Sequence, residues 1–465
     1  MSDRARVLWS FGVTAVALFM VSLDNLVVIT ALPVIKHDLG ASLSSLEWTV
    51  NAYTLTYAVL LLTGAALGER FGRKLMFVVG LGIFTAASAA AALAPTIQTL
   101  IAARVIQGMG GAIVTPLTLT ILSAVVPPAR RGLALGAQGG ISGLAVAIGP
   151  LVGGVVSQDL SWHWIFWLNV PIGLAVLLLG LVWLPESRGL KRPLDLPGLG
   201  LVSAGLFAIV FGLVSATEQS WGSPSVAGPL AAGGVLLAAF VGWELRSRAP
   251  MVPMELFRSR PFSIANVVAL SMYFGLFGSV FLLAQFLQVV QGYSPQQAGL
   301  RTLPWTGMPI LVTPIAGALS DRIGSRPLLV IGMALMSAAL VWLAVVSSPT
   351  VPYLDLIGPF AMAGFGMSLF FASAATLVLS AVPRQDEGTA SGVSNTIREV
   401  GGVFGVAVLA TVFTAAGSYA SPSTFVTGLT AAVWVGAAVV GIGAIAALAL
   451  PGHRRLAVHR DEVSD

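Results

Sequence analysis

Acidic residues inside apolar segments are the residues of this sequence that could do chemistry. The segment from Val7 to Ile35 contains a single charged residue, Asp24. Glu399 lies at a similar depth in the apolar segment 387–414. A carboxylate in the middle of a bilayer costs a few kcal/mol or more, and such groups are functional by default. We therefore predict that Asp24 binds and releases a proton. A structural acid, paired with an arginine or with backbone amides, is the alternative.

Arg104 is the basic residue that could act together with Asp24. The positions of the two residues along their apolar segments place both in or near the outer half of a membrane. An arginine stays protonated at physiological pH, so it favours ionised Asp24, whereas apolar surroundings favour the neutral acid. A conformational change that alters this balance would load or release one proton. Glu399 is a second candidate proton site, or a group that attracts cationic substrates.

The elements that must position these residues are membrane-spanning helices. Of the 465 residues, 56% are hydrophobic and 9% are charged, and the mean hydropathy is +0.91. A soluble domain has ~25% charged residues, and ~20 apolar residues suffice to cross a bilayer as a helix. The sequence therefore predicts an all-α polytopic membrane protein. Its fourteen expected spans are residues 8–36, 46–68, 75–94, 97–122, 131–157, 162–184, 196–215, 227–246, 262–291, 297–319, 326–346, 352–380, 387–414 and 425–449.

The composition excludes several classes of function. The chain has no cysteine, which removes disulfides and thiolate metal sites. None of its three lysines follows a glycine, so no Gly-Lys-Ser/Thr phosphate loop is present. Its four histidines do not have a metal-ligand spacing. We expect no cofactor, no metal, no ATP hydrolysis and no enzymatic activity. Nucleic acid is not an expected partner, because the basic residues lie in short loops between apolar segments.

The distribution of lysine and arginine predicts the orientation. Twenty of the 24 basic residues lie in one set of alternate loops, and Lys36 alone lies in the opposite set. Positively charged loops stay in the cytoplasm, so both termini are expected there. The first apolar segment is too long for a cleavable signal. With a composition typical of a high-GC bacterium, the expected location is the bacterial inner (cytoplasmic) membrane, as a multi-pass protein.

A charged loop motif occurs twice. Residues 65–74 read Ala-Ala-Leu-Gly-Glu-Arg-Phe-Gly-Arg-Lys, and residues 317–326 read Gly-Ala-Leu-Ser-Asp-Arg-Ile-Gly-Ser-Arg. Two copies with one orientation predict parallel halves related by an axis along the membrane normal. The expected organisation is an N-terminal six-helix bundle (1–190), two inserted helices (191–250), a C-terminal six-helix bundle (251–450) and a cytoplasmic tail (451–465).

The residues of this motif are candidates for gating. An acid at the membrane edge can pair with arginines and accept N–H groups at a helix N-terminus, which would hold the cytoplasmic side shut in one conformation. The alternative is that the basic residues of the motif only set the orientation of the helices in the membrane. A second candidate for gating is the helix kink at Gly149-Pro150. Tight helix packing without any gating role explains these two residues equally well. The candidate gating residues are Glu69, Arg70, Gly72, Arg73, Lys74, Gly149, Pro150, Asp321, Arg322 and Gly324.

Polar and aromatic residues within the spans could line a substrate cavity. Polar groups are disfavoured against lipid, so they are expected to face inward. For the aromatic residues and methionines an ordinary core position is the alternative. Together they predict a large apolar pocket suited to amphipathic organic substrates. The candidates are Asn51, Tyr53, Tyr57, Gln107, Gln138, Tyr273, Gln285, Gln288, Trp305, Met362, Phe365 and Asn395.

Several short motifs follow one another along the chain. They are Leu23-Asp24 with Ala31-Leu32-Pro33, Leu67 to Lys74, Arg104 with Gln107, Gly108 and Gly110, Gly149-Pro150 with Gly153-Gly154, and Trp162 to Phe166 with Asn169 to Gly173. In this order they resemble motifs of the major facilitator superfamily, most of all its fourteen-span drug:proton antiporter branch. The chain departs from those motifs at Ala65, Glu69, Ile29 and His163. Ile29 replaces an expected asparagine near Asp24.

The resemblance implies a major-facilitator fold of two six-helix bundles plus two additional helices. It also implies a proton-coupled antiporter that exports amphipathic compounds (drugs, antibiotics, dyes) by alternating access, as a monomer. Two alternatives remain. One is a proton-coupled or facilitative transporter of one specific metabolite or self-made antibiotic. The other is a membrane receptor or scaffold that does not transport. The two deep acids argue against it, and so does the sequence pattern, which predicts no soluble domain.

Overall fold

A computed structural model describes residues 3–127, 131–188, 195–382 and 387–451, and these residues form helices joined by short turns. The expected tail lies almost entirely outside the described residues. The helices of the first half and the following pair are α1 (Asp3–Leu39), α2 (Leu43–Phe71), α3 (Arg73–Ala92), α4 (Ile97–Val125), α5 (Arg131–Asp159), α6 (His163–Trp167), α7 (Asn169–Trp183), α8 (Leu196–Ser215) and α9 (Pro224–Glu244). The second half contains η2 (Met254–Arg258), α10 (Arg260–Gln285), η3 (Phe286–Val290), α11 (Pro295–Thr306), α12 (Met308–Ile323), α13 (Ser325–Val346), α14 (Tyr353–Ser380), α15 (Glu387–Ala416) and α16 (Pro422–Leu448).

The helix ends follow from the local sequence. Ser42, Thr96, Ser294 and Ser421 each accept a hydrogen bond from a backbone N–H of the helix that follows, which satisfies one of the donors left free at a helix start. Gly40 ends α1 with a positive φ of 60°, a conformation that glycine adopts without steric cost. Polar capping residues therefore alternate with apolar segments, as a polytopic helical protein requires.

Twelve helices within the described residues are long and apolar enough to cross a membrane. Two expected spans are not among them. The expected span 131–157 coincides with α5, and the expected span 297–319 is divided into α11 and α12, each shorter than a bilayer crossing. The division occurs at Gly307, between Pro304 inside α11 and Pro314 inside α12. Prolines remove backbone hydrogen bonds and break helices, which hydropathy alone does not detect.

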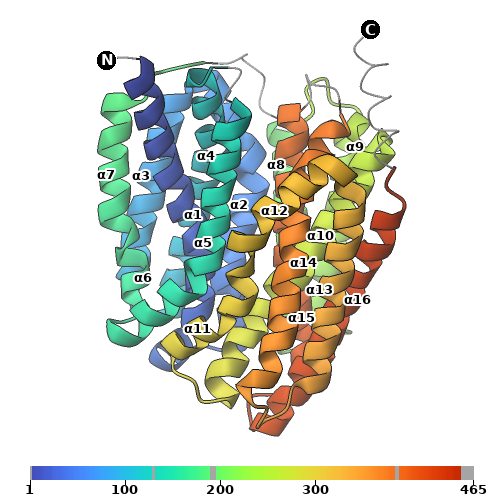
Figure 1. Ribbon diagram of the computed structural model, residues 1–465. Coiled ribbons are helices and arrows are strands. Elements are labelled where there is room, and N and C mark those ends of the chain that lie inside the picture. Colours follow the sequence, from blue (N-terminus) through green and yellow to red (C-terminus); the bar gives the residue numbers. More distant parts are fainter. Residues whose placement is uncertain (1–2, 128–130, 189–194, 383–386, 452–465) are drawn as a thin grey trace.

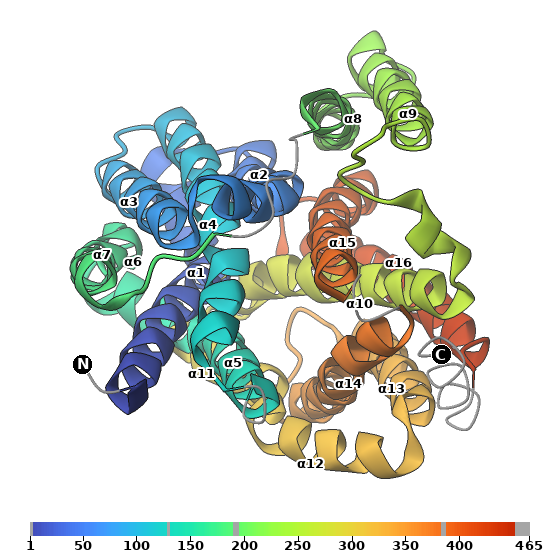
Figure 2. The same cartoon turned by 90° about the horizontal axis from the view of Figure 1, so that it is seen from above.

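The helices form two groups and a separate pair (Figures 1 and 2). Helices α1 to α7 make one group, and α10 to α16 make the other. The pair α8 and α9 lies at the edge of the molecule in Figure 2, where α8 packs against α2 and α15. We call the end where α1 begins and α16 ends the terminal end, and the opposite end, with the α1–α2, α3–α4 and α15–α16 turns, the distal end.

The two groups meet mainly through α5 with α11 and α2 with α15. Near the distal end the Gln288 side chain donates to the Thr30 carbonyl (2.8 Å), and the Gln296 N–H donates to Gln158 Oε1 (3.2 Å). Lys36 Nζ of α1 lies 3.3 Å from the centre of the Tyr419 ring, in the α15–α16 turn. These contacts close the distal end between the two groups.

Candidate functional site

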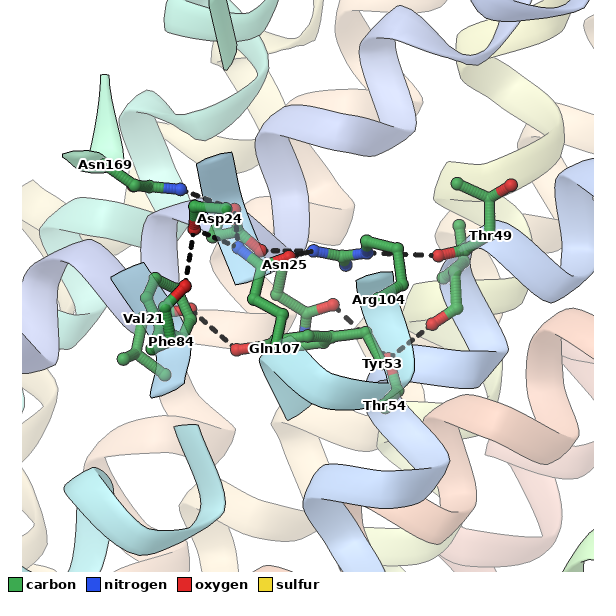
Figure 3. A network of polar contacts seen from close by, with 12 residues as sticks. Val21, Asp24, Asn25, Thr49, Tyr53, Thr54, Phe84, Arg104, Gln107 and Asn169 are labelled. Atoms are coloured by element: carbon green, nitrogen blue, oxygen red, sulfur yellow. Dashed lines mark hydrogen bonds and ion pairs between the residues drawn. The ribbon is translucent and has the colours of Figure 1, made fainter. Parts of the chain in front are cut away.

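Asp24 lies at the centre of a buried polar network in the first group of helices (Figure 3). Its side chain is inaccessible to solvent and forms an ion pair with Arg104 Nη1 of α4. The other carboxylate oxygen, Oδ1, accepts from Gln107 Nε2 and from Asn169 Nδ2, each at 2.8 Å. The network thus brings the expected pair of Asp24 and Arg104 together and surrounds the acid with three donors.

Arg104 is held from several sides besides Asp24. Its Nε donates to the Thr49 carbonyl (3.2 Å) and its Nη1 to Gln107 Oε1 (2.8 Å). Its guanidinium carbon lies 4.1 Å from the centre of the Tyr53 ring, close enough for a cation–π interaction. Nη2 has no hydrogen-bond partner among the side chains and backbone groups described. The guanidinium therefore keeps favourable contacts that do not depend on the charge of Asp24.

Two members of this network are absent from the sequence-based candidates. Asn169, at the start of α7, donates to Asp24, and Ser88 of α3 accepts from Gln107 Nε2 at 2.8 Å. Asn169 belongs to one of the motifs quoted above, but nothing in the sequence places it beside Asp24. It supplies a polar group next to the acid.

Glu399 is the second deep acid, and it lies where the two groups of helices face each other. It is half-buried on α15, and within the part of the chain that the structure describes its Oε2 has no hydrogen-bond partner. It interacts electrostatically with Tyr57 of α2 and Tyr273 of α10. Arg398, the preceding residue, also interacts with Tyr273. The structure brings Tyr57 and Tyr273, from opposite groups, to the same acid.

The remaining cavity candidates occupy different environments. Tyr53, Gln107, Asn51 and Gln138 are buried in the first group, where both Asn51 and Gln138 lack hydrogen-bond partners. Gln285 donates to the Phe281 carbonyl (3.1 Å) and accepts from the Tyr419 hydroxyl. Gln288 bonds to Thr30 across the two groups, as given above. Met362 and Asn395 are half-buried, whereas 40% of Phe365 is exposed.

Small residues let α5 lie against α1 and α11 at the distal side. A Cβ on Gly149 would come within 2.9 Å of Leu26 on α1. A Cβ on Gly154 or Gly299 would overlap a backbone carbonyl oxygen, of Pro295 and of Pro150 respectively. Pro150 and Trp305 line the same small cavity of about 20 Å³ between the two groups. Gly149 therefore packs against α1 within its own group, whereas Pro150, Gly154 and Gly299 form a direct backbone contact between the two groups.

The first charged loop is tied to its own group of helices. Glu69 pairs with Arg73, with 2.7 Å between carboxylate and guanidinium atoms. Glu186, and not Glu69, accepts hydrogen bonds from the N–H groups at the start of α3. The donors are the backbone N–H groups of Lys74 (3.1 Å) and Leu75 (3.2 Å). Lys74 Nζ donates to the Leu181 carbonyl near the end of α7 (2.6 Å). Arg70 contacts the ring of Phe71.

The second loop repeats this geometry. Gly72 and Gly324, at matching positions of the motif, both have positive φ, of 120° and 84°. Arg326 matches Lys74 and donates to the Leu448 carbonyl at the end of α16 (2.7 Å). In each half a basic residue of the loop thus binds the last helix of the same half. Arg322 is exposed, and the side chain of Asp321 lies outside the described ones.

Comparison with known proteins identifies the family. The model of the Major Facilitator Superfamily matches residues 14–406. The chain belongs to this superfamily. It is 36% identical over 397 residues to the tetracenomycin C resistance and export protein of Streptomyces glaucescens, covering 85% of this chain and 74% of that protein. It is 33% identical to the multidrug export protein EmrB of Haemophilus influenzae, covering 85% and 78%.

A solved structure supports the same fold. A crystal structure of the peptide transporter POT superposes with a TM-score of 0.69 at 14% identity, covering 97% of each chain. As a member of the major facilitator superfamily, the chain is a multi-pass membrane transporter, and the family resemblance seen in the sequence is confirmed. The Asp24 network lies within the first group of helices of this fold.

Proposed function

We propose that this protein exports amphipathic organic compounds from the bacterial cytoplasm in exchange for protons. The proposal is carried by one observation: Asp24 is a membrane-buried acid held by one permanent cation and two neutral amides. A change in the distance between Asp24 and Arg104 would change the affinity of the acid for a proton. The names of the relatives, which include drug and antibiotic export proteins, support export.

The proposal includes fourteen spans with both termini in the cytoplasm. The twelve apolar helices, together with α5 and the α11–α12 pair, are consistent with this number. The terminal end is then cytoplasmic, and the distal end faces outward. The contacts that close the distal end correspond to a conformation shut toward the outside. Residues between the halves, such as Tyr57, Tyr273 and Glu399, are proposed to contact the substrate.

Transport by reconstituted protein tests the proposal. Proteoliposomes with an imposed pH gradient are loaded with a fluorescent cationic dye, and dye movement is measured for the wild-type chain, Asp24→Asn and Asp355→Asn. Asp355 is an exposed acid in the first turn of α14, so its variant controls for the loss of one negative charge. We expect dye to move against the proton flux in the wild type and in Asp355→Asn. Asp24→Asn should lose the dependence on the gradient.

Two outcomes would contradict proton-coupled export, and a third would contradict the role of Asp24. Dye movement at an equal rate after collapse of the gradient would remove proton coupling. Movement of dye in the same direction as protons would replace export by proton-coupled uptake. Full gradient-driven transport by Asp24→Asn would assign the proton to another residue.

A further inference from the structure

A second buried acid, Glu47 on α2, is outside the Asp24 network. Its relative exposure is 0%, and neither carboxylate oxygen has a hydrogen-bond partner among the described residues. Asn51 follows one helical turn later, is equally buried, and also has no partner for its amide oxygen or nitrogen. Residues four apart lie on one face of a helix. Four buried polar atoms on one face of α2 are therefore without partners in this conformation.

This face of α2 lies in the contact between the two halves. Further along α2, Leu55 and Val59 pack with Val403 and Ala407 of α15. Glu47 itself is near the distal end, where it interacts electrostatically with the Tyr419 hydroxyl of the α15–α16 turn and with Glu218 of the α8–α9 turn. Tyr419 is in turn held by Gln285 and lies under Lys36. The contacts that close the distal end thus cover Glu47.

No cation compensates Glu47 among the described side chains. On the elements packed against α2, the titratable and charged groups among the described side chains are Arg6, Asp24, Lys36, His37 and Asp38 on α1, Arg104 on α4, Arg398 and Glu399 on α15, and Arg73 and Lys74 at the terminal end of α3. His37 and Asp38 are exposed, and Asp38 accepts a hydrogen bond from Trp162 Nε1. Arg104 pairs with Asp24, Lys36 lies over the Tyr419 ring, and α8 contains no charged residue. The neighbouring group Glu218 is an acid, so it opposes a negative charge on Glu47.

A buried, unpaired carboxylate costs several kcal/mol when ionised. The closed distal end therefore accommodates Glu47 as the neutral acid, whereas separation of α2 from α15 would admit water and permit ionisation. We propose that Glu47 is a second proton-binding group, which must take up a proton from the outer side before the distal end can close. This inference rests on the alternating access of the proposed function, and it assigns a role in that cycle to a residue distinct from Asp24.

The distance across the distal end tests the inference without substrate or transport. The chain has no cysteine, so spin labels can be placed at Gln98→Cys and Thr350→Cys, two exposed positions at the distal ends of opposite halves. Distances are measured in lipid nanodiscs between pH 5 and pH 9. In the wild type, the ratio of closed to open protein should rise as pH falls, by up to ~10-fold per pH unit where one proton is bound. Glu47→Gln should lose this rise in the ratio of closed to open protein as the pH falls.

Three further variants make the result specific. Glu47→Asp keeps a titratable group and should keep the pH response, so a folding defect in the glutamine variant would not obscure the outcome. Glu218→Gln removes the neighbouring exposed acid and should retain a transition. Asp24→Asn should also retain it. An unchanged pH response in Glu47→Gln, or its loss in Asp24→Asn alone, would overturn the role of Glu47 while leaving proton-coupled export standing.

Discussion

A proton on Asp24 would leave the guanidinium of Arg104 buried without its counter-ion. The contacts of Arg104 show how this charge is accommodated, because the Tyr53 ring and the Thr49 carbonyl remain in place whichever form Asp24 takes. The cost of a buried, unpaired cation is thereby reduced. Protonation of Asp24 is therefore compatible with an intact first half, and the network does not have to come apart when the acid becomes neutral.

The donor Asn169 provides a test at this scale. Asn169→Ala removes one hydrogen bond to the carboxylate, and such bonds to charged groups contribute about 1.5–3 kcal/mol. The bond favours ionised Asp24, so its loss strengthens proton binding. We expect the pH of half-maximal transport to shift upward by about one unit or more, since one unit corresponds to ~1.4 kcal/mol. Asn25→Ala, on the same helix as Asp24, is the matched control. The pH profile of gradient-driven dye transport is the measurement, and an unshifted profile in Asn169→Ala would contradict the expected contribution.

The sequence predicts part of this site because charge is costly in a membrane. Asp24 and Arg104 stand out in apolar segments, and their depths predict that they can meet, as they do. Asn169 and Ser88 carry no charge, so their presence in a helix has no comparable cost and no signal. The role of Glu186 cannot be predicted for a different reason. It lies in a loop rich in charged residues, where one more acid is not unusual, and only the fold places it at the start of α3.

Helices α5 and α11 form the closest backbone contact between the halves, and glycine makes this contact possible. Gly299→Ala would place a Cβ against the Pro150 carbonyl oxygen, and overpacking of this kind costs about 1–3 kcal/mol. The cost applies only while the distal end is closed. We expect the ratio of closed to open protein, measured with the labels at Gln98 and Thr350, to fall by at least about fivefold in this variant.

The control for this substitution is Gly317→Ala on α12, where an added Cβ meets no atom within 4 Å. It should leave the distance distribution unchanged. If Gly299→Ala also leaves it unchanged, the α5–α11 contact does not hold the distal end closed. If both variants shift it equally, the effect belongs to helix propensity and not to the contact.

The predicted spans coincide with helices of the structure, with one clear exception. Hydropathy reads 297–319 as one span, but Gly307 and its flanking prolines divide it into α11 and α12. The Gly149-Pro150 motif predicts a special site on α5 but not its partner, because Gly299 becomes its neighbour only through the packing of the two halves. Local patterns thus identify where a helix is unusual, while tertiary packing decides what it touches.

At the scale of the whole molecule, the charge distribution makes a prediction about orientation. Single cysteines at Gln98 in the distal end and at Arg248 in the terminal end are both at exposed positions, in a chain without other cysteines. Positively charged loops stay inside, so a membrane-impermeant maleimide added to intact cells should label Gln98→Cys and not Arg248→Cys. Permeabilised cells, in which both should react, are the control. Labelling of Arg248→Cys in intact cells would reverse the proposed orientation.

The bonds from Lys74 to α7 and from Arg326 to α16 have a thermodynamic consequence for the transport cycle. A bond whose two partners move as one rigid body is equally strong before and after that body rotates, so it cancels from the free-energy difference between the two end states. These bonds stiffen each half without favouring either conformation. The charged loops can favour one conformation only if Lys74 or Arg326 exchanges its present partner for a partner in the opposite half. Such an exchange would make the strength of the bond differ between the two conformations.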